Sequence, residues 1–246
     1  MKLIVNADDF GYSKGVNLGI IEAFKHGIVR STSMMTNMPG TEHAISLMKE
    51  NPDLGVGIHL VLTTGKPVAE NVPSLVNDSG YFHSLRDLDK YVKIEDVEKE
   101  FTYQLEKFLS FGFKPTHIDS HHHVHTHEAI LPIVIKLAEK YQLPVRKFTQ
   151  DPLQEEKYKQ IKTTDHFIYQ FYGDNLTLEI IEHLLELQYT GETVELMCHP
   201  AYLDHDLLKG SSYNVQRVNE LNILTHPKTL EVINKHHIEL INYKHI

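Results

Sequence analysis

The feature that most constrains this chain is a regular alternation of short apolar runs with helical patterns along all 246 residues. The apolar runs have the length and the branched residues of buried strands. Strands that alternate with helices are typical of a parallel sheet with helical crossovers. We therefore expect an α/β fold of about seven parallel strands, an incomplete or distorted (β/α) barrel that is TIM-barrel-like but not regular and eightfold. Eight runs are candidates for these strands, namely Leu3–Val5, Thr32–Thr36, Gly55–Leu62, Thr116–Asp119, Val145–Phe148, His166–Tyr172, Thr193–Cys198 and Ile238–Asn242.

The helical patterns carry start and stop signals. Ser13 is the expected N-cap of the first helix, and Gly27 its stop. The longest pattern, Ile94–Phe111, ends at Gly112. The other expected helices are Glu42–Lys49, Ala129–Tyr141 with Pro132 in its first turn, Leu178–Leu187, Asn214–Leu224 and Lys228–Lys235. Because no repeat or Gly/Ser linker divides the chain, residues 1–246 are expected to form one domain.

Composition limits the classes of partner. Hydrophobic residues make up 41% of the chain, enough for a sizeable core. The formal charge of −9 repels phosphate backbones and anionic lipids, so neither nucleic acid nor a membrane is expected as a partner. The single cysteine, Cys198, excludes an internal disulfide and fits a reducing, cytoplasmic location. The start, MKLIVNADDF, is typical of neither a signal peptide nor a membrane span.

Ionisable side chains follow four separate apolar runs. Asp8 and Asp9 come after the first, His59 lies in the third, a run of histidines follows Thr116–Asp119, and His199 follows Thr193–Cys198. In a (β/α) barrel the carboxyl ends of the strands meet at one face, where active sites are built. Their shared position along the strands therefore predicts one site.

Other roles are open for each group taken alone. The two aspartates could cap the following helix, and His59 could be a hydrogen-bonded core histidine. Cys198 could be a nucleophile, although a buried thiol in an apolar run is more often inert. The stretch HHHVHTH at 121–127 could be an exposed metal-scavenging tract, but it is embedded between a strand and a helix.

Spacing helps to choose among the clustered histidines. Side chains alternate along a strand, so His117, Asp119, His121 and His123 share one face while the strand lasts. If a helical turn follows, His121 and His125 are neighbours at i and i+4. His121 suits both geometries and is the first choice as a metal ligand, with His125 in reserve. Asp119 is placed to accept a hydrogen bond from the second nitrogen of a ligand imidazole.

One aspartate and two histidines describe a three-ligand metal site that keeps positions for water and substrate. Imidazoles favour Zn, Fe, Co or Ni over Mg. A bound divalent ion makes its water more acidic. Asp8 and His199 are then the natural pair to take a proton from that water and to protonate a leaving group.

The motifs NADDFG (6–11), GIHLVLT (57–63), THIDSHHHVH (116–125) and MCHPAY (197–202) together resemble the YdjC-like carbohydrate deacetylases, the chitooligosaccharide deacetylase group. The motifs occur in the family's order, and the similarity runs from Leu3 to the last expected strand. The resemblance implies a barrel-like α/β fold. It also implies removal of acetyl groups from N-acetylglucosamine units of small chitin oligomers, such as diacetylchitobiose or its 6-phosphate.

Carried over residue by residue, the resemblance implies that Asp9, His59 and His121 are the metal ligands. It makes Asp8 the general base and His199 the general acid. Arg146 resembles the arginine that orients the base; the alternative for Arg146 is a surface salt bridge. The resemblance also implies magnesium, whereas the ligand types favour a transition metal, so Mg is placed first, with Zn, Co or Ni as alternatives.

Residues 66–93 are aperiodic and rich in Pro, Asn and Asp. Loops this long are usually functional, so we expect a lid over the site, with Tyr81 and Phe82 available to stack on a sugar ring. A homodimer is expected because paired subunits are the commonest assembly. The competing functions are a non-haem metal oxygenase, a metal-dependent phosphoesterase, and a metal-buffering or sugar-binding protein that does no chemistry.

Overall fold

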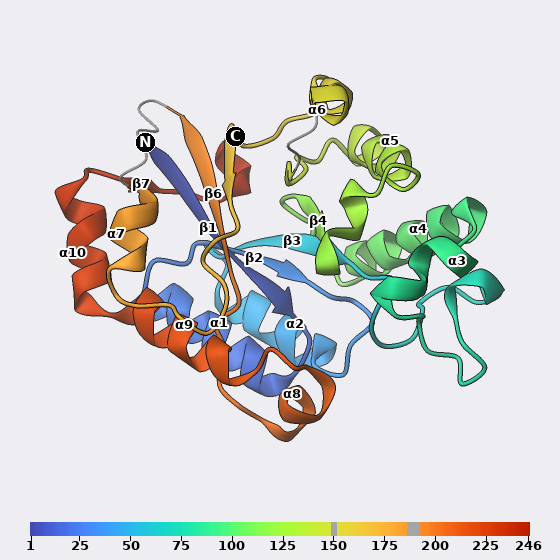
Figure 1. The fold of residues 1–246 in the computed structure, drawn as a ribbon, viewed down its shortest axis with the longest axis horizontal. Helices are drawn as coiled ribbons and strands as arrows, with labels where there is room; N and C mark the ends of the chain where they lie inside the picture. Colours follow the sequence, from blue (N-terminus) through green and yellow to red (C-terminus); the bar gives the residue numbers. More distant parts are fainter. Residues whose placement is uncertain (149–151, 186–191) are drawn as a thin grey trace. The chain divides into compact units, whose positions relative to one another are not determined.

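The computed structural model describes residues 1–148, 152–185 and 192–246 (Figure 1). These residues divide into two units. Unit 1 contains Met1–Met34, Pro39–Val56 and Thr164–Ile246. Unit 2 contains Met35–Met38 and Gly57–Thr163. The expectation of one domain stays a prediction.

The sheet of unit 1 is built around β1 (Lys2–Phe10), whose side chains are buried from Leu3 onward. On one side β1 pairs with β2 (Ser31–Met34), and on the other with β6 (Thr193–Cys198), which pairs in turn with β5 (His166–Ile168). The first residues of β1 also pair with β7 (Glu239–Leu240). All four pairings are parallel, as the alternation of strands and helices predicted.

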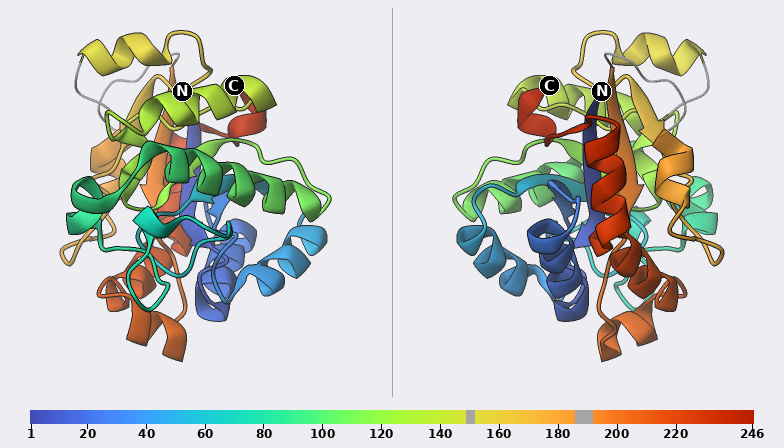
Figure 2. Two further views of the ribbon diagram at one scale, coloured as in Figure 1. Left: turned by 90° about the vertical axis from the view of Figure 1, so that its right-hand side faces the viewer. Right: turned by 90° about the vertical axis from the view of Figure 1, so that its left-hand side faces the viewer.

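Helices cover one face of this sheet (Figure 2). Neighbouring helices pack in the order α2, α1, α9, α10 and α7. Their bounds are α1 (Lys14–His26), α2 (Thr41–Glu50), α7 (Ile180–Leu185), α9 (Val215–Thr225) and α10 (Pro227–Lys235), and the short α8 is His205–Gly210. The expected caps are confirmed for α1, because Ser13 Oγ accepts a hydrogen bond from the Val16 amide and the helix ends at Gly27.

Two glycines let the chain after β6 cross α1 closely. A Cβ atom at Gly15 would collide with the carbonyl of Tyr202, and one at Gly19 with the backbone of Ala201. The amide of Gly15 also donates to Asp204 Oδ2 at 2.6 Å. The segment that begins with His199 is therefore fixed against α1 by backbone packing.

Unit 2 contains the parallel pair β3 (Gly55–Leu60) and β4 (Ile118–Ser120); the first two residues of β3 fall in unit 1. Its longest helix is α4 (Ile94–Ser110), which matches the predicted Ile94–Phe111 closely. The other elements are three 3-10 helices, η1 (Pro73–Leu75), η2 (Leu85–Asp87) and η3 (His121–Thr126), and the helices α3 (Leu88–Tyr91), α5 (Leu131–Tyr141) and α6 (Pro152–Tyr158).

The 66–93 segment is more structured than its aperiodic sequence suggested. Besides η1, η2 and α3, it contains a bridge between Val76 and Phe82. Glu100, on α4, accepts hydrogen bonds from the amides of Val68 and Ala69, both at 2.8 Å. Two anchors on α4 thus hold the start of the segment, because Asp96 also accepts from Ser74.

Several predicted elements differ from the structure. The expected strand Val145–Phe148 is wrong, since Val145 makes one isolated bridge to Ile118 and the rest is not strand. The last strand is Glu239–Leu240 and not Ile238–Asn242, because the chain turns at Asn242 into η4 (Tyr243–His245). The C-terminal end of the predicted helix Leu178–Leu187 lies outside the described residues.

The α/β class with parallel strands is confirmed. The described part of the chain holds seven strands, in line with a barrel that falls short of eight. Within that part, every helix is too short or too polar to cross a lipid bilayer.

Candidate active site

Asp8 and Asp9 lie at the carboxyl end of β1, where the pairing of β1 with β2 is irregular. The register with β2 shifts between Ala7 and Phe10, and Asp9 has a left-handed backbone with φ of 72°. Such a bulge breaks the alternation that would send two consecutive side chains to opposite faces. A non-glycine residue with positive φ is uncommon, and such residues cluster at active sites. Neither aspartate caps α1, because Ser13 does.

Each aspartate has a fixed neighbour in unit 1. Asn6 Nδ2 donates to Asp8 Oδ1 at 2.9 Å. Arg217, on α9, forms a buried ion pair with Asp9, with 2.7 Å between its Nη2 and Asp9 Oδ2. Arg217 Nε also donates to the carbonyl of Tyr213 at 2.8 Å, so the guanidinium is held at two points.

His199 leaves the sheet beside Asp8. Ala7 of β1 pairs with Cys198, the last residue of β6, so Asp8 and His199 each follow one member of this pair. The His199 amide donates to Glu220 Oε2, and its ring Nδ1 lies 3.9 Å from Glu220 Oε1. The rings of Tyr172 and Tyr213 meet the His199 ring edge-on, at 5.6 and 5.8 Å between centroids.

Glu220 is the buried hub of this part of the site. Its Oε1 accepts a hydrogen bond from the hydroxyl of Tyr213. Burial raises the pKa of Glu220 to about 8, even though its hydrogen bonds and Arg217 oppose the shift. Near neutral pH the carboxyl group is therefore mostly protonated, and His199 faces a largely neutral partner.

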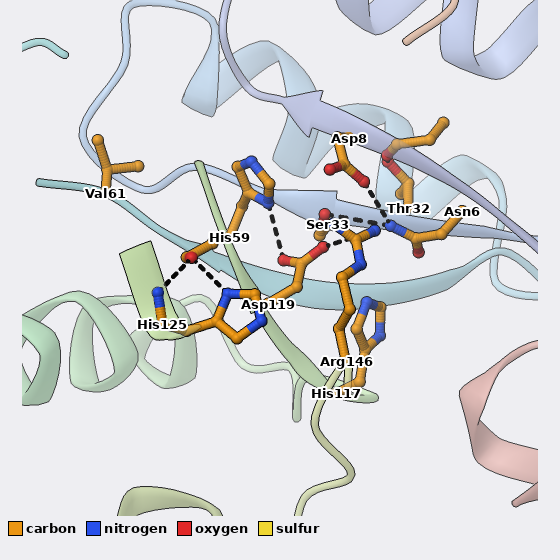
Figure 3. A network of polar contacts seen from close by, with 12 residues as sticks. Asn6, Asp8, Thr32, Ser33, His59, Val61, His117, Asp119, His125 and Arg146 are labelled. Carbon is orange, nitrogen blue, oxygen red and sulfur yellow. Dashed lines mark hydrogen bonds and ion pairs between the residues drawn. The ribbon is translucent and has the colours of Figure 1, made fainter. Parts of the chain in front are cut away.

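In unit 2, His59 is held by a buried chain of charged groups (Figure 3). His59 and Asp119 are paired in the β3–β4 register, and His59 Nδ1 donates to Asp119 Oδ1 at 2.7 Å. Arg146 completes the chain, with its Nη2 3.0 Å from Asp119 Oδ2. Arg146 is fully buried, so the alternative of a surface salt bridge is wrong.

This arrangement suits a metal ligand. Burial alone would raise the pKa of Asp119, but its interactions with His59 and Arg146 outweigh burial and hold the pKa below its usual range. An ionised Asp119 that accepts from Nδ1 fixes the tautomer of His59, with the ring lone pair on Nε2, which is the state that a metal ligand requires. The sequence predicted that Asp119 would orient a ligand imidazole, and the structure shows that it orients His59.

A sharp turn follows β4 and sets the histidine cluster. His122 and His123 both have left-handed backbones, with φ of 55° and 53°, so the strand pattern ends at Ser120. His121 is the first residue after the strand, and its ring centroid lies 5.8 Å from that of His59. Two imidazoles are thereby brought together within unit 2, as expected for a pair of ligands.

His125, the reserve ligand, is engaged differently. Ser120 Oγ accepts a hydrogen bond from the His125 amide at 2.9 Å and forms a second hydrogen bond, of 2.6 Å, with His125 Nδ1. His125 Nδ1 is therefore engaged with the residue that ends β4. Burial and the charge of His123 lower the pKa of His125 to about 3, so the ring stays neutral. The geometry favours His121.

Other candidates of the sequence have ordinary roles. The thiol of Cys198 is buried and lies 3.4 Å from the carbonyl oxygen of Asn6, which does not suit a nucleophile. Phe82 is buried, so it is not available to stack on a substrate, whereas Tyr81 is 49% exposed with Lys66 over its ring at 4.9 Å. Sequence reasoning missed Arg217, Glu220 and Tyr213; the available signal was two charged residues on the buried face of α9.

Comparison with known proteins places these features in a family context. The family model for YdjC-like proteins matches residues 2–235. A carbohydrate deacetylase from Clostridium beijerinckii is 50% identical, and one from Brevibacillus brevis is 51% identical. Both alignments cover 100% of this chain and 100% of the relative.

Solved structures support the fold. A protein from Enterococcus faecalis V583, described as a cellobiose-phosphate cleavage protein, superposes with a TM-score of 0.95 and is 38% identical, covering 99% of this chain and 98% of its own. A peptidoglycan N-acetylglucosamine deacetylase superposes with a TM-score of 0.53 at 11% identity, covering 98% and 85% of the two chains. The second likeness concerns the fold alone.

Proposed function

Because this chain belongs to the YdjC-like protein family and is a carbohydrate deacetylase, we propose that it hydrolyses N-acetyl groups of small chitooligosaccharides with the help of one divalent metal ion. The substrates proposed are diacetylchitobiose and its 6-phosphate. The observation that carries the proposal is the buried chain His59–Asp119–Arg146, which prepares one histidine nitrogen for a cation.

We assign Asp9, His59 and His121 as the ligands. One carboxylate and two imidazoles fit an open divalent site, with Mg first and Zn, Co or Ni as alternatives. The left-handed backbone of Asp9 and its ion pair with Arg217 hold its carboxylate in one orientation. When bound, the ion would polarise the amide carbonyl and make a water molecule more acidic.

Asp8 is assigned as the general base. Its carboxylate takes a proton from the water that attacks the carbonyl carbon of the N-acetyl group. The hydrogen bond from Asn6 holds Asp8 Oδ1, which orients the carboxylate for this step. Arg146 is proposed to help position the base, a role that would be additional to its ion pair with Asp119.

His199 is assigned as the general acid. As the C–N bond breaks, the imidazolium protonates the departing amine, and the products are the free amino sugar and acetate. Glu220 and two tyrosines hold the ring at the end of β6. No covalent intermediate is required, which agrees with the buried, inert position of Cys198.

The direct test measures acetate release from diacetylchitobiose and from its 6-phosphate. The protein is first stripped with a chelator and then supplied with Mg, Zn, Co or Ni in turn. We expect no acetate from the stripped protein and restored release with at least one metal. Equal release with and without metal would contradict metal dependence.

The same reactions separate the competing functions. Oxygen consumption would indicate an oxygenase, and phosphate release from the 6-phosphate would indicate a phosphoesterase. The Enterococcus faecalis relative is described as cleaving a phosphorylated disaccharide, so release of N-acetylglucosamine by cleavage between the two sugars should also be measured. Several weakly bound ions without turnover would support a metal buffer. The cytoplasmic location, the homodimer and the lid stay predictions.

A further inference from the structure

An exposed aromatic pair lies beside His199 in unit 1. Tyr172, shortly after β5, is 51% exposed. Its ring stacks on that of Tyr213, with 4.0 Å between centroids and 13° between planes. The two rings stand at 72° and 75° to the His199 ring. Tyr172 therefore presents an open apolar surface next to the side chain assigned as the acid.

Hydrogen bonds fasten this pair to α9. The amide of Gly173 donates to Tyr213 Oη at 2.9 Å, and the same hydroxyl donates to the buried Glu220. Gln216 Nε2 donates to Asp174 Oδ1 at 2.6 Å, and Asn219 Nδ2 donates to the carbonyl of Leu176 at 2.9 Å. The segment that carries Tyr172 is thus held at three points, so little ordering remains to be done on binding.

The chemistry of the neighbourhood points to a sugar ring as the ligand. The acid must touch the nitrogen that leaves, and that nitrogen is bonded directly to a pyranose carbon. The pyranose ring consequently lies within a few ångströms of His199. One face of such a ring carries C–H groups, which pack well on an aromatic surface, while its hydroxyls point outward.

Resting on the proposed function, we propose that Tyr172, backed by Tyr213, is the stacking platform for the amino-sugar ring that is deacetylated. The platform belongs to the same unit as Asp8 and His199. It differs from the expected contact through Tyr81 and Phe82, because Phe82 is buried and Lys66 lies over the ring of Tyr81.

The test compares Tyr172→Ala with Tyr172→Phe and Tyr172→Leu. Tyr103→Ala is the control, since Tyr103 is an exposed tyrosine on α4. Loss of the apolar contact between the sugar and the aromatic ring is expected to raise KM for diacetylchitobiose roughly tenfold in Tyr172→Ala, with kcat within about threefold. Tyr172→Phe should keep the wild-type KM because it keeps the ring. Tyr172→Leu keeps apolar bulk without the ring and should behave like the alanine variant.

An unchanged KM in Tyr172→Ala would overturn the platform. A fall in kcat with unchanged KM would also overturn it, since the ring would then act only by positioning His199. Calorimetric binding of diacetylchitobiose, measured in the Asp8→Asn background, gives a readout that does not depend on turnover. If the wild type releases no acetate, the proposed function fails, while weaker binding by Tyr172→Ala would still support the platform.

Discussion

His59 and His199 both stand at or next to the carboxyl end of a parallel strand, yet their surroundings differ. His59 is fully buried and donates to an ionised carboxylate that a buried arginine holds. His199 is partly exposed, with a largely protonated glutamate 3.9 Å from its ring and two tyrosine rings beside it. The two side chains are chemically the same, so the difference between them comes from their neighbours.

The difference matches two kinds of work. A permanent hydrogen bond to Asp119 gives His59 one tautomer, as a ligand needs. A general acid must gain and lose a proton within each cycle, and a strong ion pair would oppose the loss. The neutral state of Glu220 near pH 7 avoids such an ion pair while the backbone of His199 stays anchored.

The largest effect is expected from variants that remove a proton-transfer group and keep the three assigned metal ligands. Asp8→Asn and His199→Ala should each lower kcat by about 10²–10⁴, the typical contribution of one positioned acid or base. Metal content should stay at the wild-type value in both. His205→Ala, which alters an exposed histidine on α8, is the control. Near-wild-type turnover in either variant would remove that residue from its assigned role.

The next largest effect is expected when Asp119, the hydrogen-bond partner of His59, is changed. In Asp119→Asn the side chain keeps its size but loses the charge that orients the imidazole. Metal affinity is expected to fall by about 10–100-fold, the usual loss when such a partner is changed. A metal titration followed by acetate release measures this fall. Unchanged metal affinity would mean that the contacts among His59, Asp119 and Arg146 have only a structural role.

A third experiment concerns the Glu220 side of the comparison. The pKa of Glu220 is about 8 in the folded chain, against an ordinary value of 4.5, so the folded state binds more protons between these values. The associated stability is present in full below about pH 4.5 and is lost as the pH rises through about 8. The free energy of unfolding should therefore fall more steeply between about pH 4.5 and pH 8 in the wild type than in Glu220→Gln.

Urea unfolding at several pH values measures these slopes. Glu231→Gln, on the exposed side of α10, is the control and should keep the wild-type slope. Equal slopes for wild type and Glu220→Gln would show that Glu220 is ionised in the folded chain, and the contrast between the two histidines would be lost.

The smallest effect tests whether unit 2 also contacts the sugar. If the 66–93 segment is a lid, Tyr81→Ala should raise KM roughly two- to threefold, less than the change at Tyr172, because Lys66 already lies over the Tyr81 ring. Steady-state kinetics on diacetylchitobiose measures it. An unchanged KM would remove Tyr81 from the substrate contacts.

The sequence predicts best where one local pattern decides the outcome. The strand Thr193–Cys198 was predicted to the residue, because an apolar run ends abruptly at His199-Pro200. The N-cap Ser13 and the α/β class follow from equally local signals. The partnership of Asp119 with an imidazole was predictable in kind from side-chain alternation, but the imidazole proved to be that of His59, on a neighbouring strand.

The rest depends on tertiary structure. The left-handed backbone of Asp9 has no signature in a pair of aspartates, since the register shift against β2 creates it. Glu220 lies 21 positions beyond His199 and resembles any acid on an amphipathic helix until burial is known. The prediction of a strand at Val145–Phe148 was wrong because these residues favour a strand locally, but Val145 forms only one isolated bridge to a neighbouring strand.

The most direct test of the account is the metal content of the purified chain after dialysis, compared with that of His59→Ala. The account predicts one tightly held divalent ion per wild-type chain and a loss of that ion in His59→Ala, with His205→Ala unchanged. An equal metal content in wild type and His59→Ala would contradict it, as would several weakly bound ions that the histidine change does not affect.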